Sequence, residues 1–141
     1  WSPLLQLPGI VWVNLQYGDV KNEIKNAEQE FGVAILDFAD VDHFTDLDTS
    51  AALMKACDLV IGPATSTTQI SAAIGVPTIR LSSGYDYFCL GTDYYLWFPS
   101  LNEISRPFGE TWTAPIQQTA NIVQILAAEH AHVAGSHVNT Q

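Results

Sequence analysis

Residues 58–77 constrain the fold more than any other part of the chain, because they read as a strand, a turn and a short helix. Residues 59–61 are apolar with two β-branched members, and Gly62 begins the break that follows. Gly75 then ends the expected helix, and a proline opens the next strand. This succession of elements is the repeating unit of a parallel α/β sheet.

Hydroxyl side chains crowd the expected start of this helix, at Thr65, Ser66, Thr67 and Thr68. The first turn of a helix has unpaired backbone N–H groups and a partial positive charge, so an anion can bind there with hydroxyls as further donors. In the alternative interpretation Thr65 or Ser66 is only the N-cap, and the other hydroxyls bond to nearby backbone. The residues alone leave both interpretations open.

Strand and helix patterns alternate along the chain. Apolar runs predict strands at residues 10–15, 33–36, 59–61 and 78–81, and a short strand at 102–105. Helices are expected between Asp19 as a cap and Gly32, over about residues 49–57 with Asp48 or Thr49 as N-cap, over the hydroxyl-rich segment, and from Thr113 onwards. Parallel strands need crossover connections, so the alternation predicts an α/β, Rossmann-like fold with one parallel sheet flanked by helices.

Composition narrows the class of protein. The chain has 141 residues, of which 48% are hydrophobic, enough for one domain with a core. We expect that domain to cover residues 1–132, followed by a flexible tail at 133–141. A net charge of −10 disfavours nucleic acid as a partner. No apolar run is long enough for a membrane span, so a cytoplasmic protein with reduced Cys57 and Cys89 is expected.

Three stretches carry a resemblance to a known family: DTSAALMKACDLVI (48–61), TSTTQISAAIGVP (65–77) and DYYLWFPS (93–100). Over about residues 1–130 the chain resembles the C-terminal, nucleotide-sugar-binding lobe of GT-B glycosyltransferases. The closest resemblance is to heptosyltransferase-like domains linked to tetratricopeptide repeats in bacteria. The resemblance implies that this chain is a partial lobe whose first strand is missing. It also implies that the intact protein has an N-terminal lobe and tetratricopeptide repeats, which this chain lacks.

The resemblance implies where a nucleotide-diphosphate-sugar donor would bind. Its diphosphate would rest on the hydroxyl-rich turn and on Gln69, and its base and ribose would lie near Gln16, Asp37 and Phe38. Because ligands of open α/β sheets bind outside the carboxyl ends of the strands, these positions are expected to share one edge. Tyr85, with its neighbours Asp86 and Tyr87, follows the fourth strand at the same edge, whereas Trp97 and Phe98 are expected to pack.

The resemblance implies a reaction that transfers a sugar to an acceptor hydroxyl and needs neither a cofactor nor a metal. It also implies that this lobe is inactive without the N-terminal lobe. No catalytic residue is expected in this chain, which has no motif of a nucleophilic hydrolase or P-loop kinase. The acidic residues 37–48 lack the EF-hand spacing, so a solvated loop is preferred to a metal site.

Two departures from the family pattern favour an alternative function. Ala64 stands where the family pattern usually has an acidic residue, and Gln69 stands where it often has a His. A Gln side chain cannot carry positive charge or move a proton. A catalytically inactive binding or scaffolding domain is therefore the alternative. An exposed sheet edge would also permit a homodimer.

Overall fold

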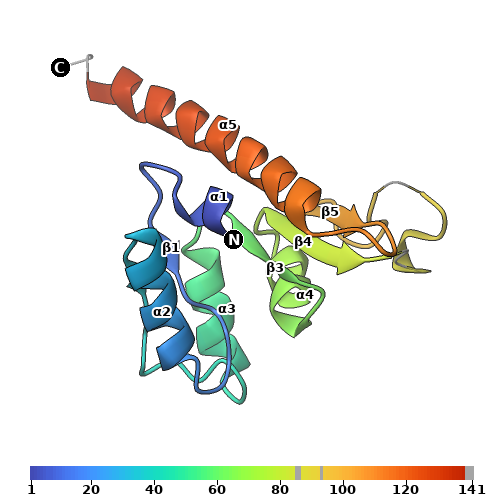
Figure 1. Ribbon diagram of the computed structural model, residues 1–141, viewed down its shortest axis with the longest axis horizontal. Helices are drawn as coiled ribbons and strands as arrows, with labels where there is room; N and C mark the ends of the chain where they lie inside the picture. Colours follow the sequence, from blue (N-terminus) through green and yellow to red (C-terminus); the bar gives the residue numbers. More distant parts are fainter. Residues whose placement is uncertain (85–86, 93, 139–141) are drawn as a thin grey trace.

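The computed structural model describes residues 1–84, 87–92 and 94–138 and confirms an α/β fold with parallel strands flanked by helices (Figure 1). The first half contains α1 (Ser2–Leu5), β1 (Trp12–Val13), α2 (Lys21–Phe31), β2 (Ile35–Leu36) and α3 (Leu47–Lys55). The second half contains β3 (Val60–Pro63), α4 (Ser66–Ala73), β4 (Thr78–Ser83), the 3-10 turn η1 (Tyr87–Cys89), β5 (Leu101–Arg106) and α5 (Thr113–Val138).

The strands form two separate parallel sheets in the described residues, not the single sheet that the sequence predicts. In the first sheet β1 pairs with β2, with Trp12 opposite Ile35. In the second the order is β3-β4-β5, with Val60 opposite Thr78 and Thr78 opposite Leu101. The strand identities are thus confirmed, but no backbone ladder joins β1 to β3.

Helices cover both faces of this arrangement. In Figure 1, α1 and α5 lie above the strands, whereas α2, α3 and α4 lie below them. On the α5 side, Ile116 packs with the buried apolar residues Ile79, Leu81 and Ile104 of the three-stranded sheet. The other face of β4 carries polar side chains at alternate positions, because successive strand residues point to opposite faces. This polar face is covered by α4 and the aromatic segment that follows β4.

Two details of the helix ends differ from the predictions. The N-cap of α3 is Asp46, whose carboxylate accepts from the Thr49 backbone N–H, and not Asp48 or Thr49. The N-cap of α2 is Val20, without a side-chain cap, instead of Asp19. Gly32, as predicted, ends α2 in the left-handed conformation with φ 66°.

The C-terminal helix is longer than the sequence suggested. It continues to Val138, beyond the expected domain boundary at residue 132. Its last turns project past the rest of the molecule in Figure 1. Flexibility of residues 133–141 remains a prediction, and residues 139–141 lie outside the described part. Among the described residues no helix is both long enough and apolar enough to cross a membrane.

The aromatic segment after β4 packs only in part as predicted. Tyr95 is 3% exposed and stacks on Phe98, with their ring centroids 5.8 Å apart. Both belong to a cluster with Ala72 of α4 and Leu101 of β5. Trp97 instead remains 62% exposed, so Phe98 and Tyr95 provide the anchor and Trp97 does not.

Candidate functional site

The hydroxyl-rich turn lies where β3 leads into α4, at the carboxyl end of the strand. Thr65 is the N-cap of α4, as predicted, and forms a capping box with Thr68. Gly62 permits the close approach of this turn to β3, because a Cβ at this position would lie 3.2 Å from the Thr68 Cγ2 atom. The sequence therefore fixes the helix start against the strand through a glycine and two threonines.

Thr68 serves the local structure. Its side chain is fully buried, and its hydroxyl donates to the carbonyl oxygens of Pro63 at 2.9 Å and Thr65 at 3.1 Å. The same oxygen accepts from the Thr65 N–H at 3.4 Å. This hydroxyl is committed to backbone and is not available to a ligand, in contrast to the prediction that it contributes to an anion site.

Ser66 and Thr67 are the groups of this turn that remain open to a ligand. The Ser66 side chain is exposed and the Thr67 side chain is half-buried. Within the described residues neither their backbone N–H groups nor their hydroxyls make a hydrogen bond. Two N–H groups and two hydroxyls at the positive end of a helix can together bind an anion by donating hydrogen bonds to it.

Gln69 takes part in a buried polar network instead of lying open beside the turn. Its amide Nε2 donates to the Tyr95 hydroxyl at 2.9 Å, and its Oε1 accepts from Arg80 Nη1 at 3.4 Å. The Arg80 guanidinium lies over the Tyr95 ring, 4.4 Å from its centroid. Gln69 thus links α4 to β4 and the aromatic segment.

The positive charge of Arg80 is paired inside the protein. Arg80 forms an ion pair with Glu103 of β5, and their side chains are 2% and 6% exposed. The other carboxylate oxygen of Glu103 accepts from the Ser82 hydroxyl at 2.7 Å, and Ser82 also bonds to Ser105 at 2.9 Å. The sequence analysis did not predict this network. The available signal was the alternation of Thr78, Arg80 and Ser82 with apolar residues along β4, which indicates a polar face on a buried strand.

The residues predicted to contact a base and ribose gather at the carboxyl ends of β1 and β2. Asn14, which is 7% exposed, donates to the Asp37 carboxylate at 2.9 Å and accepts from the Gln16 backbone N–H at 3.0 Å. Phe38 follows directly and is 45% exposed. Asn14 is the residue that sequence reasoning missed here, and its signal was a polar residue within an apolar strand.

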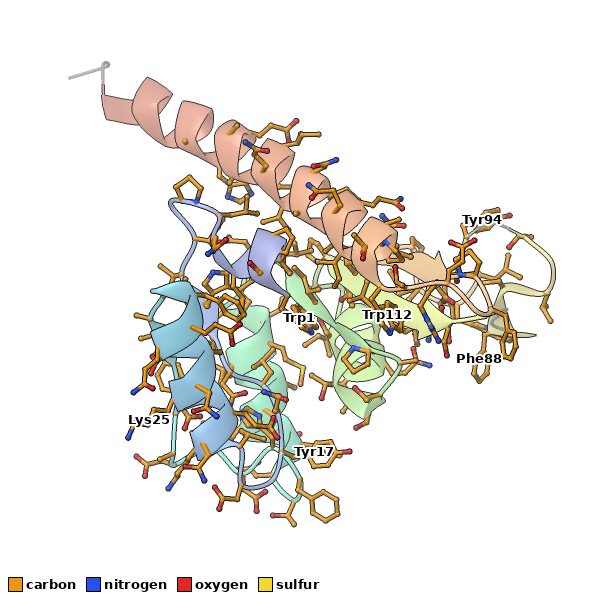
Figure 2. The ribbon with its side chains drawn as sticks, in the orientation of Figure 1. Trp1, Tyr17, Lys25, Phe88, Tyr94 and Trp112 are labelled. Carbon is orange, nitrogen blue, oxygen red and sulfur yellow. The ribbon has the colours of Figure 1, made fainter. Side chains whose placement is uncertain are left out.

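Hydrogen bonds do not connect these two groups of described residues. No hydrogen bond among the described residues joins Gln16 or Asp37 to the α4 turn. In Figure 2, Tyr17, which follows Gln16, lies in the lower part of the molecule. Tyr85, the remaining predicted site residue, and Asp86 lie outside the described residues, and of Tyr87 only the backbone is described.

The acidic loop uses its carboxylates to cap turns. The Asp42 pKa is lowered because its carboxylate accepts from the Thr45 hydroxyl and from the backbone N–H groups of Phe44 and Thr45. The Asp46 pKa is lowered in the same way, mainly by the Thr49 hydroxyl. In the part of the chain that the structure describes, no three His, Cys, Asp or Glu side chains are grouped to hold a metal.

A separate apolar hollow of about 220 Å³ lies beside β1 and β2. It is lined by residues from the end of α1 to β1 and from around β2, which are Leu5, Leu7, Ile10, Val11, Trp12, Val33, Ala34 and Leu36. All of these side chains are apolar apart from the Trp12 indole N–H, which is buried without a partner in the described structure. This lining does not suit a phosphate.

The chain is 40% identical over 129 residues to the protein FlbA of Caulobacter vibrioides. The match covers 91% of this chain but 22% of FlbA, so the chain spans about a fifth of that protein. No protein-family model matches the sequence, and no solved structure is significantly similar. The similarity therefore relates this chain to one region of a longer bacterial protein.

Proposed function

We propose that this chain is the donor-binding lobe of a GT-B glycosyltransferase of the heptosyltransferase-like type. The diphosphate of a nucleotide sugar would rest on the first turn of α4. The observation that carries this proposal is the pair Ser66 and Thr67 at the carboxyl end of β3, whose N–H groups and hydroxyls have no hydrogen-bond partner among the described residues. The parallel α/β fold and the resemblance described above support it.

The charges around the α4 turn indicate which groups would stabilise a bound diphosphate. Arg80 is paired with Glu103, so it adds little net charge to a bound diphosphate. Stabilisation of the leaving diphosphate would come from the helix dipole, backbone N–H groups and hydroxyls, without a metal or other cofactor. The base and ribose would contact Gln16, Asp37 and Phe38, and Tyr85 remains a predicted contact.

Transfer itself would need parts outside this chain. A general base from an N-terminal lobe would take the proton of the acceptor hydroxyl, and this chain alone would be inactive. Tetratricopeptide repeats and a cytoplasmic location belong to the same proposal. The short match to FlbA is compatible with a lobe that functions within a longer polypeptide.

Isothermal titration of the chain with UDP, GDP, ADP and inorganic pyrophosphate tests the proposal. We expect at least one nucleoside diphosphate to bind, and Thr67→Ala to weaken its binding by about tenfold or more, because a hydrogen bond to a charged group contributes about 1.5–3 kcal/mol. Thr111→Ala is the control, since it removes an exposed hydroxyl remote in sequence from the turn. Binding that Thr67→Ala and Ser66→Ala leave unchanged would contradict the proposed site.

A catalytically inactive binding or scaffolding domain is the second candidate. The Gln69 amide is held by Tyr95 and Arg80, and the chain carries a charge of −10, which opposes the approach of a diphosphate. Absence of heat with every nucleotide, in a folded chain, would favour this candidate. Light scattering would separately test the expected homodimer.

A further inference from the structure

Gln69 closes the first turn of α4, the turn that carries Ser66 and Thr67. Its backbone N–H donates to the carbonyl oxygen of the cap residue Thr65 at 3.2 Å, so the turn is complete only when Gln69 is in place. The N–H groups and hydroxyls that this turn offers to an anion point in fixed directions only if the turn itself is held. A contact that fixes Gln69 therefore also fixes these donors.

Both ends of the Gln69 side-chain amide are bonded to residues outside α4. The Nε2 atom donates to the hydroxyl of Tyr95, 26 positions along the chain, at 2.9 Å. The Oε1 atom accepts from Arg80 Nη1 at 3.4 Å, which is the longer and weaker of the two bonds. The Tyr95 hydroxyl is thus the main restraint on the orientation of this amide.

Tyr95 is itself fixed by packing that does not involve the α4 turn. Its ring is 3% exposed and lies 5.8 Å from the ring of Phe98 and 6.1 Å from that of Phe88, measured between centroids. The Arg80 guanidinium lies 4.4 Å from the Tyr95 centroid and is paired with Glu103. Aromatic contacts and a buried ion pair therefore determine where the hydroxyl lies.

We propose that Tyr95 is a positioning residue for the anion-binding turn of α4 and that it acts through Gln69. This inference rests on the proposed function, because it concerns the same Ser66 and Thr67 donors. When an anion is bound, Gln69 keeps its bonds to Tyr95 and Arg80 and makes none to the phosphate. Its role differs from the direct contact that the family resemblance implies.

The variant Tyr95→Phe removes the hydroxyl and keeps the ring with its packing. The turn then spends less time in the conformation that binds, and the apparent Kd rises in proportion. We expect the affinity for inorganic pyrophosphate to fall by about threefold to tenfold in a calorimetric titration, the range for one net hydrogen bond. The affinity for the best of UDP, GDP and ADP should fall by the same factor, because this turn holds only the phosphates.

Ser100→Ala is the matched control for a general loss of structure. Ser100 lies in the same aromatic segment, and its hydroxyl donates to the Ala72 carbonyl oxygen in the last turn of α4 at 2.7 Å. Its removal deletes one hydrogen bond between the same two elements but leaves the first turn intact. We expect pyrophosphate affinity to stay nearly unchanged, whereas equal weakening by Ser100→Ala and Tyr95→Phe would overturn the positioning role.

Hydrogen exchange of the ligand-free chain, followed by NMR, tests the same role without a ligand. In Tyr95→Phe the Gln69 amide should exchange at least about threefold faster, because the first turn opens more often. The Ile74 amide, which bonds to the Ile70 carbonyl oxygen at the other end of the helix at 3.0 Å, is the internal reference. Unchanged exchange of the Gln69 amide would show that Tyr95 does not act through Gln69.

A double-mutant cycle separates positioning from direct contact. Gln69→Leu should weaken pyrophosphate binding about as much as Tyr95→Phe, and the double variant should bind no more weakly than either single one, because the two residues act as a unit. If the losses add, Gln69 contacts the phosphate itself and the positioning role is wrong.

The titrations also distinguish this role from the proposed function. Binding by the unmodified chain that Tyr95→Phe leaves unchanged would overturn the role of Tyr95 and leave the proposed function intact. If the unmodified chain binds neither pyrophosphate nor any of UDP, GDP and ADP, the proposed function fails and the positioning role fails with it.

Discussion

The three-stranded and two-stranded sheets of this molecule differ in how completely their strands are supported. In β3-β4-β5 the strands are four to six residues long, and Ile79, Leu81 and Ile104 are at most 5% exposed. In β1-β2 each strand has two residues, and Leu36 remains 46% exposed. Both halves come from a similar alternation of strand and helix patterns, so the alternation alone does not determine how long or how buried the strands become.

The same contrast separates the two candidate binding regions. The α4 turn is attached to the well-supported sheet, and Thr68 and Gln69 hold it through buried hydrogen bonds. The Gln16 and Asp37 region follows the two-residue strands and is held through Asn14. We therefore expect the phosphate region to be preformed in this chain and the base region to be less stable.

The largest expected effect comes from breaking the buried ion pair of the three-stranded sheet. Arg80→Ala leaves the Glu103 carboxylate buried without its partner, so the free energy of unfolding should fall by about 3–5 kcal/mol. Urea denaturation measures it. Arg106→Ala is the control, because Arg106 donates to the exposed Glu110 carbonyl oxygen and should contribute less. Equal losses would mean that the pair does not support β4 and β5.

A matched pair of core truncations compares the two sheets directly. Ile79→Ala should lower the free energy of unfolding by about 2–5 kcal/mol, because Ile79 is 2% exposed and its removal leaves a cavity. Ile35→Ala in the partly exposed β2 should cost less than half as much. A loss at Ile35 as large as that at Ile79, again by urea denaturation, would contradict the view that β1-β2 is the weaker half.

Neighbouring threonines in the α4 turn should separate structure from binding. Thr68→Val removes a buried donor to two carbonyl oxygens and should destabilise the protein by about 1–3 kcal/mol. Thr67→Ala removes a hydroxyl with no partner among the described residues and should change stability by less than about 0.5 kcal/mol. If Thr67→Ala were the more destabilising, the assignment of roles would be reversed.

The smallest expected effect is a pH dependence at the start of α3. The pKa of Asp46 is lowered from its ordinary value of 3.8, so its contribution is present above that pH and is lost as the pH falls through the lower folded value. Asp46→Asn should therefore reduce the fall in stability between about pH 5 and pH 2. Asp40→Asn, which removes an exposed carboxylate, is the control, and an unchanged fall in Asp46→Asn would contradict this role.

Local signals predicted the elements of the fold well, but contacts between distant residues were not predictable. Thr65 and Gly75 mark the N-cap and the end of α4 by their own preferences. The predicted break at Gly62 was wrong, because β3 continues through Gly62 to Pro63. The engagement of Gln69 with Tyr95, 26 residues away, depends on tertiary packing that no local pattern encodes.

The division of the sheet and the cap of α3 were missed for related reasons. Alternating strands and helices predict parallel pairing but do not state which strands are neighbours. Asp46, Asp48 and Thr49 are all good N-cap residues, so the choice among them depended on where the preceding loop packs. Thr68 shows the same limit, since four consecutive hydroxyls give no local sign of which one is buried.

The central claim is that the first turn of α4 binds the diphosphate of a nucleotide. The most direct measurement is an NMR titration of ¹⁵N-labelled chain with UDP, GDP and ADP, following the backbone amides of Ser66 and Thr67. We predict that one of these nucleotides shifts both resonances more than that of Asn121, which lies on the exposed side of α5 and bonds to Gln117. Saturating shifts confined to residues around the apolar hollow, or no shift with any of the three nucleotides, would contradict the claim.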